Sequence, residues 1–244
     1  MNINISPTAA ELGASAAKFV TEKLNDAIKR NGEARLVVST GSSQFETLQA
    51  LTQSKIEWNK VEIFHLDEYI DLPVTHKASF RKYLHERFIS LIDVKNFFSV
   101  DTEENVAEKI NELTTAIREK PVDVGLIGIG ENAHIAFNDP PADFDSRDAY
   151  KIVHLDDRCK MQQVNEGWFN TTDKVPDTAL SMTVWQIMQC KTIVSCVPHK
   201  PKAQAIKKTL LNKLTNNIPS TMLKQHGDYH LYVDYNSIAE VVVF

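Results

Sequence analysis

The sequence predicts a single-domain α/β fold built on a mostly parallel, doubly wound sheet of the Rossmann-like kind. Helical and strand patterns alternate along the chain, with only short Gly, Pro or Ser breaks between them. The strand segments read as continuous apolar runs, which is typical of parallel strands that helices cover on both faces. A length of 244 residues fits one such unit better than two. We therefore expect one domain over residues 1–244.

The first half of the chain supplies four helices and two strands. Ser6 followed by Pro7 is typical of a helix N-cap and first helical residue, and Gly32 after Lys29 and Arg30 predicts the end, so a helix is expected over residues 7–31. β-branched or apolar runs predict strands at 35–40 and 61–66. Further helices are expected after Gln44, at about 78–92 and at about 103–119, with a short apolar run at 97–100.

The second half continues the alternation. The apolar segment 122–130 predicts a buried strand, and further strands are expected at 150–155, 191–197 and 229–233, with helices between them. In open parallel sheets, ligands bind beyond the carboxyl ends of the strands, near the point where the strand order reverses. The residues that directly follow each strand are therefore the candidate site.

The composition excludes several classes of protein. With 43% hydrophobic and 24% charged residues, the chain has an ordinary globular composition, and its net charge of −5 provides no global positive field for nucleic acid or an anionic membrane. Its three cysteines stand at no metal-ligand spacing and suit a reducing compartment. No targeting signal and no stretch near the roughly 18 apolar residues of a spanning helix is present. We expect a cytoplasmic protein without nucleic-acid or membrane partners.

Two of the strand ends suit an anion. Thr40, Gly41, Ser42 and Ser43 come directly after a strand and before a helix, where hydroxyls, free amides and the helix dipole favour a phosphate. The alternative is an ordinary helix cap. Lys202 lies between a strand and a helix and can place a point charge on the same phosphate, although surface lysines are common.

Two other strand ends suit acid–base chemistry. Asp67 and Glu68 follow a strand as adjacent carboxylates, which are either general bases or solvated loop acids. His134 follows a glycine-rich strand end, with Asn132 and Asp139 close enough in sequence to orient its ring. A single histidine is often structural, but these neighbours favour a functional one.

Together these segments identify a family. The chain resembles the glucosamine-6-phosphate deaminases, also called isomerases, which are related to the 6-phosphogluconolactonases. The resemblance rests on the turn at residues 40–43, the segment 67–69 with Leu72 and Pro73, and above all the run His-Ile-Ala-Phe-Asn-Asp-Pro at 134–140. Further matches lie at 175–176, 179–183 and 202–203, so they cover nearly the whole chain in the family's order.

The resemblance implies conversion of glucosamine 6-phosphate and water into fructose 6-phosphate and ammonia, without a metal or organic cofactor. It implies that Asp67 moves a proton from C2 to C1 and that His134, supported by Asn132 and Asp139, helps to open the sugar ring. The phosphate would rest on Thr40, Gly41, Ser42, Ser43 and Lys202, and Glu68 would also contact the substrate. Alternatives are another sugar-phosphate enzyme of the same fold, such as a 6-phosphogluconolactonase-like hydrolase or an isomerase, or a non-catalytic sugar-phosphate sensor.

The chain departs from the family pattern at three of these positions. Asp139 stands where Glu is usual, and the shorter side chain puts its reach to His134 in doubt. Asn132 stands where many members have Asp, and Gly167 stands where an Arg that contacts the phosphate is usual. Arg158 or Lys160 would have to substitute for that Arg.

Three further expectations follow. Residues 149–176 are the expected lid over the ligand. The chain lacks the C-terminal segment and the basic residue of the larger allosteric members, which predicts a monomer or small homo-oligomer. His226 and His230 do not share a helical face, so no metal site is expected there. All of these inferences require Asp67, His134 and Ser42 to meet at one cleft.

Overall fold

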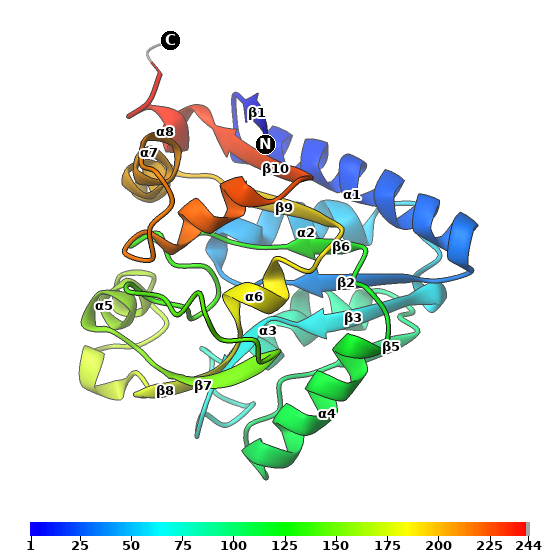
Figure 1. The fold of residues 1–244 in the computed structure, drawn as a ribbon, viewed down its shortest axis with the longest axis horizontal. Coiled ribbons are helices and arrows are strands. Elements are labelled where there is room, and N and C mark those ends of the chain that lie inside the picture. Colours follow the sequence, from blue (N-terminus) through cyan, green and yellow to red (C-terminus); the bar gives the residue numbers. More distant parts are fainter. Residues whose placement is uncertain (243–244) are drawn as a thin grey trace.

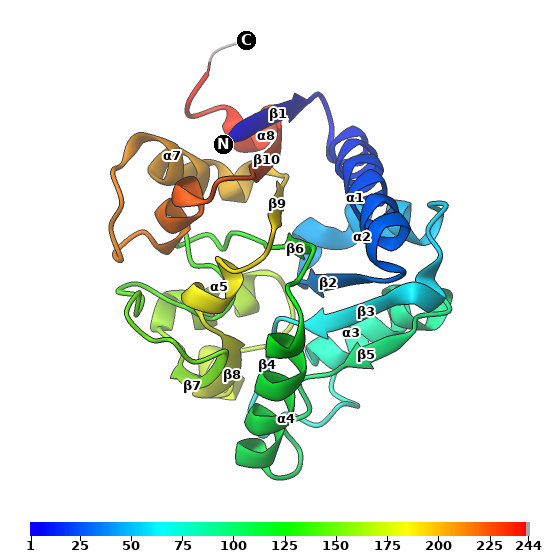
Figure 2. The ribbon, with the colours of Figure 1, turned by 45° about the vertical axis from the view of Figure 1, so that its right-hand side comes forward.

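The computed structural model describes residues 1–242 and confirms an α/β fold (Figures 1 and 2). Its central sheet has seven strands in the order β1-β10-β9-β6-β2-β3-β5, and every pair is parallel. These strands are β1 (Asn2–Ser6), β2 (Ala34–Val38), β3 (Val61–His65), β5 (Asn96–Phe98), β6 (Val124–Leu126), β9 (Thr192–Val197) and β10 (Tyr229–Asp234). Among residues 1–242, no helix is both long and apolar enough to cross a membrane.

Helices cover both faces of this sheet, so it is doubly wound. One face packs against α1 (Ala9–Asn31), α2 (Phe45–Thr52) and α3 (Phe80–Arg87). The other packs against α4 (Val106–Glu119), α6 (Val184–Ile187), α7 (Ala203–Leu211) and α8 (Tyr235–Ile238). In β2, Leu36 and Val38 belong to the first core and Val37 to the second, as the alternation of side chains in a strand requires.

A second, smaller sheet was not anticipated. Its three strands are antiparallel in the order β4-β8-β7, with β4 (Asp67–Tyr69), β7 (Tyr150–His154) and β8 (Thr178–Met182). The strand expected at 150–155 therefore exists but belongs to this sheet, and the segment after Leu66 is a strand rather than a loop. α5 (Asp157–Asn165) lies between β7 and β8 in the chain, beside this sheet (Figure 1).

The N-terminal helix α1 begins at Ala9 rather than at residue 7, where the sequence predicts it. Residues 2–6 pair with β10 at the edge of the sheet, so Ser6 ends a strand and is not an N-cap. Thr8 caps α1 instead, because its side chain accepts the N–H of Glu11 at 3.2 Å. The predicted end is confirmed, since Gly32 has φ 82° and its N–H bonds to the carbonyl of Ile28 at 2.8 Å.

Other elements are shorter than expected. The strand expected at 122–130 ends at Leu126, and the one expected at 35–40 ends at Val38. The helix expected at 78–92 is α3 followed by a 3₁₀ turn at Ile89–Leu91, and the one expected at 103–119 starts after its Asn105 cap.

The strand order reverses beside β2. From β2 the chain moves outward through β3 to β5, and then returns to place β6 on the other side of β2. The carboxyl ends of β2 and β6 therefore diverge into loops that leave a crevice between them. The turn at residues 40–43 and the segment 128–134 begin at these two ends.

Candidate active site

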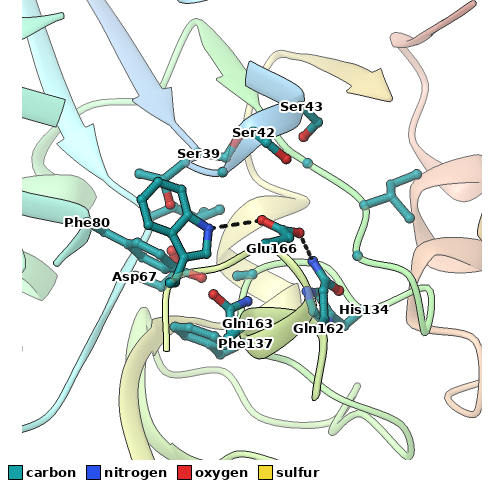
Figure 3. Close-up of a pocket in the computed structure, with 18 of the residues that line it drawn as sticks. Ser39, Ser42, Ser43, Asp67, Phe80, His134, Phe137, Gln162, Gln163 and Glu166 are labelled. Carbon is teal, nitrogen blue, oxygen red and sulfur yellow. Dashed lines mark hydrogen bonds between the residues drawn. The ribbon is translucent and has the colours of Figure 1, made fainter. Parts of the chain in front are cut away.

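A pocket lies at this switch point and encloses about 570 Å³ of space that is partly open to solvent (Figure 3). Seven of the expected site residues line it, namely Thr40, Gly41, Ser42, Ser43, Asp67, His134 and Lys202. Asp67, His134 and Ser42 thus meet at one cleft, as the sequence argument requires.

The turn after β2 presents polar groups to the pocket. Gly41 has φ 102°, a conformation that favours glycine, and it leads into the 3₁₀ helix Ser42–Gln44 and then α2. The hydroxyl of Tyr83 donates to the carbonyl of Gly41 at 2.9 Å, and the Gln44 amide donates to Ser43 Oγ at 2.9 Å. These bonds fix the turn, and the start of a helix leaves backbone N–H groups without intrahelical partners, as an anion site needs.

Lys202 is the positive charge of the pocket. It closes the 3₁₀ helix Lys200–Lys202 before α7, and only 6% of its surface is exposed. Burial lowers its pKa, while the carboxylates of Glu166 and Glu131 act to raise it. No ion pair joins Lys202 to any residue in the range 1–242. A buried ammonium that forms no direct ion pair with the protein is suited to an anionic ligand.

Asp67 lies in a buried environment that disfavours the ionised form of its carboxyl group. It starts β4, pairs with Ser181 of β8, and lies beside Phe80 and Phe137 in the pocket (Figure 3). Burial, and then the neighbouring Glu68, raise the pKa of Asp67 to about 8, although a backbone hydrogen bond from Phe137 works in the opposite direction. A carboxyl group with a pKa near neutrality is suited to exchange protons with a substrate.

The structure does not bring Glu68 into the pocket. Adjacent side chains of a strand point to opposite faces, and Glu68 is fully buried on the side away from Asp67's pocket. Its carboxylate accepts hydrogen bonds from the Ser79 hydroxyl at 2.8 Å and the Arg81 backbone N–H at 2.8 Å, and Arg81 Nε lies 3.4 Å away. Burial raises the pKa of Glu68, and these donors counteract the rise. Glu68 therefore anchors β4 to α3.

His134 is fixed by the two residues expected to orient it. Its Nδ1 lies 2.9 Å from Asp139 Oδ1, and its backbone N–H donates to Asn132 Oδ1 at 3.0 Å. The Asn132 amide donates to the same Asp139 oxygen at 2.9 Å. Gly130 packs so closely that a Cβ there would lie 2.2 Å from His134 Nε2, so glycine is required at this position. With its proton on Nδ1, the ring has Nε2 free to act as a base.

Asp139 connects the histidine to α5. Its second oxygen accepts the backbone N–H of Asp156 at 3.2 Å, and Asp156 caps α5. Burial alone would raise the pKa of Asp139, but its hydrogen bonds from His134 and Asn132 bring it below the ordinary value. The residue is thus an ionised acceptor that positions the imidazole.

One group of side chains among residues 1–242 has the types and closeness of metal ligands. The ligand atoms of His134, Asp139 and Cys159 lie within 4.8 Å of one another. Two of the three already bond to each other, whereas structural zinc sites use four ligands. We interpret the group as a hydrogen-bonded cluster. His226 and His230 bond instead to the Cys190 carbonyl and to Asp228.

The sequence predicts residues 149–176 as a lid, but it did not identify the individual residues of α5 and of the following segment that line the pocket. Gln162, Gln163, Glu166 and Trp168 all line the pocket. The only signal was a polar helix that carries two buried glutamines, Gln162 and Gln163, which periodicity alone does not distinguish from a solvated helix. Ser39, Phe80 and Phe137 were also missed, and the Ser39 hydroxyl is buried without a partner within the described chain.

Comparison with known proteins places this geometry in a family. The model for glucosamine-6-phosphate isomerases/6-phosphogluconolactonase matches residues 7–231. The chain belongs to this family. Similar members include the glucosamine-6-phosphate deaminase of Streptococcus gordonii, 31% identical over 94% of each chain, and that of Lactobacillus delbrueckii subsp. bulgaricus, 28% identical over 96% of this chain and 97% of the relative.

Solved structures of family members have the same fold. A monomeric glucosamine-6-phosphate deaminase superposes with a TM-score of 0.88 and 27% identity, over 98% of this chain and 100% of the other. A putative 6-phosphogluconolactonase from Neisseria gonorrhoeae has a TM-score of 0.75 at 20% identity, over 96% and 99% of the two chains, and shows the shared fold alone.

The departures from the family pattern have different structural outcomes. The shorter Asp139 does reach the histidine, because its backbone lies close enough for a 2.9 Å bond. Gly167 has φ 81° and ends α5, so the chain turns where the family usually carries Arg. Neither expected substitute lines the pocket: Lys160 forms an ion pair with Asp177, and Arg158 is exposed.

Proposed function

We propose that the protein converts glucosamine 6-phosphate and water into fructose 6-phosphate and ammonia. One observation carries the proposal: a carboxyl group of raised pKa, Asp67, and an oriented imidazole, His134, line the same pocket as an anion-binding turn and an unpaired lysine. Membership in the family and the names of its members at 28–31% identity support the same reaction. Because water cleaves a C–N bond, we class the protein as a hydrolase-type deaminase.

Each group has a step suited to it. Asp67 takes the proton from C2 of the open-chain sugar, which leaves an enolamine, and returns it at C1, which leaves an imine at C2. Water then hydrolyses that imine to the ketone and ammonia. His134, oriented by Asp139, transfers the proton that opens the sugar ring. Thr40, Gly41, Ser42, Ser43 and Lys202 hold the phosphate, so the reacting carbons lie between the two acid–base groups.

A second activity has an observation in its favour. The family model covers 6-phosphogluconolactonases as well, and the Neisseria structure shows that they share this fold. Purified protein should therefore be given glucosamine 6-phosphate and 6-phosphogluconolactone in parallel. We expect equal amounts of ammonia and fructose 6-phosphate from the first. Gluconate 6-phosphate from the second, without ammonia from the first, would identify a lactonase.

The role of Asp67 has a direct test. Asp67→Asn removes the base but keeps the side-chain shape, so we expect kcat to fall by about 10²- to 10⁴-fold with little change in KM. Asp71→Asn is the matched control: Asp71 is exposed, lies four residues further on, and has φ 61°, which asparagine also adopts. An Asp67→Asn protein as active as this control would remove Asp67 from the mechanism.

The setting of the enzyme is part of the proposal. We propose a cytoplasmic enzyme of amino-sugar metabolism that works as a monomer or small homo-oligomer, and the structural relative described as monomeric supports this. We also keep the proposal of a lid, but β7 is paired within the small sheet and Ala149 and Tyr150 are buried. The part of the proposed lid that lies outside β7 is then about 156–176.

A further inference from the structure

The segment that follows α5 places the carboxylate of Glu166 in the pocket. Gly167, in its left-handed conformation, ends the helix and lets Trp168 fold back beside it. The indole Nε1–H of Trp168 donates to Glu166 Oε2 at 3.1 Å, and the amide of Gln162 donates to Glu166 Oε1 at 2.7 Å. Figure 3 shows Glu166 beside Gln162, and Glu166 and Ser42 line the same pocket. The carboxylate is therefore fixed in place rather than free to swing into solvent.

This arrangement limits the positive charge of the pocket. Of the lysines and arginines among residues 1–242, only Lys202 lines it. Glu166 lines the same pocket, and Glu131, which is half-buried nearby, also acts electrostatically on Lys202. One ammonium thus faces two carboxylates. A phosphate dianion bound to Lys202 would be repelled by Glu166, because like charges in a partly dry site repel strongly.

We propose that Glu166 is a specificity determinant that selects a terminal phosphate carrying one proton and one negative charge over the dianion. The protonated phosphate oxygen would donate to the Glu166 carboxylate, while the remaining oxygens accept from Lys202 and from the turn at Ser42 and Ser43. This inference rests on the proposed function for the identity of the phosphate. It deepens that function by naming the ionisation state that the pocket accepts.

Several other titratable groups lie in or against the pocket. Glu131 acts electrostatically on Lys202, Asp67 and His134 line the same pocket, and the charge of Glu166 acts on the neutral phenols of Tyr69 and Tyr83. A pH profile of ligand binding to the wild type alone would combine the ionisation of all these groups. Glu166→Gln leaves every one of these groups in place, and its amide oxygen can still accept from Trp168. A comparison at a single pH therefore isolates the charge of Glu166.

The probe is sorbitol 6-phosphate, which has neither a carbonyl nor an amine and so cannot react. Its affinity is measured by calorimetry at pH 6.0 and pH 8.0. A phosphate monoester, with a second pKa of about 6, is about half monoanion at the first pH and almost entirely dianion at the second. At pH 8.0 we expect Glu166→Gln to bind about tenfold more tightly than wild type. At pH 6.0 the difference should shrink to about threefold or less.

Three further variants test whether the change in binding comes from the charge of Glu166 in this pocket. Asp157→Asn makes the same change of charge at an exposed position at the start of α5, and it should bind like wild type. Glu166→Ser is a second neutral variant that does not depend on the amide, and it should bind more tightly at pH 8.0 in the same way. Lys202→Met should lose affinity by about tenfold or more at both pH values. Circular dichroism confirms that each variant is folded.

Two results would overturn the inference. The first is wild-type or weaker binding by both Glu166 variants at pH 8.0, and the second is full affinity in Lys202→Met. Ammonia release does not enter this measurement. If the variants behave as expected but no ammonia forms from glucosamine 6-phosphate, the proposed reaction fails and the selection of the monoanion stands.

Discussion

The adjacent carboxylates Asp67 and Glu68 have different roles because neighbouring side chains of β4 point to opposite faces of the strand. Glu68 is held by the Ser79 hydroxyl and by Arg81, whereas Asp67 lies beside the aromatic side chains of the pocket. Neither the pair itself nor its spacing in the sequence could assign which residue faces the substrate.

The ionisation of Asp67 predicts the pH dependence of the reaction. A general base acts only when deprotonated, and a pKa of about 8 means that this form accumulates as pH rises. We expect kcat/KM of Glu166→Gln, which no longer selects the phosphate monoanion, to rise with pH and to reach half its plateau near pH 8. In the wild type the loss of the monoanion above pH 6 counteracts this rise. Ammonia release is measured from pH 6 to 9.5 in the wild type and in Glu166→Gln, which separates the ionisation of Asp67 from that of the phosphate. A flat profile in both proteins would contradict this role.

The length of Asp139 is matched to its surroundings. One of its oxygens meets the imidazole at 2.9 Å and the other meets the start of α5 at 3.2 Å. Asp139→Glu restores the residue usual in the family, yet we expect kcat to fall by about 10- to 100-fold, because an added methylene displaces the ring and about 1 Å of misplacement has effects of this size. KM should change less. Activity equal to wild type would show that the site tolerates either length.

At the scale of elements, the position of the anion-binding turn depends on a close contact between two helices. A Cβ at Gly13 of α1 would lie 2.7 Å from the backbone of Glu46 in α2, the helix that follows the turn. Gly13→Ala should destabilise the protein by about 1–3 kcal/mol, the usual effect of overpacking. It should also raise KM as α2 shifts.

Thermal unfolding measures this effect, and about 1 kcal/mol corresponds to roughly 2–4 °C for a chain of this size. Gly227→Ala is the matched control, since a Cβ there meets nothing within 4 Å. An unchanged melting temperature in Gly13→Ala would show that the two helices can separate freely.

The parallel sheet could be predicted because its strands are buried on both faces and read as apolar runs, as in β9 with all six residues buried. The small sheet could not, because β4 has only three residues and its pairing with β8 joins segments more than 100 positions apart. β1 was missed because Ile3 and Ile5 are exposed on an edge strand and give no core signal. The site residues at strand ends were predictable, whereas those on α5 depend on how that helix packs.

At the scale of the whole molecule, the raised pKa of Asp67 lowers the free energy of unfolding as pH increases. Asp67 ionises at about pH 8 in the folded protein and near pH 3.8 without the fold. Below the lower value both states are protonated and no penalty exists. As pH rises from about 4 to 8, only the unfolded state releases its proton, so Asp67 progressively favours unfolding, and above 8 the penalty is constant.

Asp67→Asn should therefore be more stable than wild type at high pH. The amide is never charged, so the gain in melting temperature should be near zero at pH 4, grow up to pH 8 and then level off. A gain of at least about 2–4 °C at pH 8 corresponds to about 1 kcal/mol. Scanning calorimetry on both proteins across this range tests it, with Asp71→Asn as the control. A gain that is equal at pH 4 and pH 8 would point to packing rather than to charge, and Asp67 would then not be the reluctant acid on which the proposed catalysis depends.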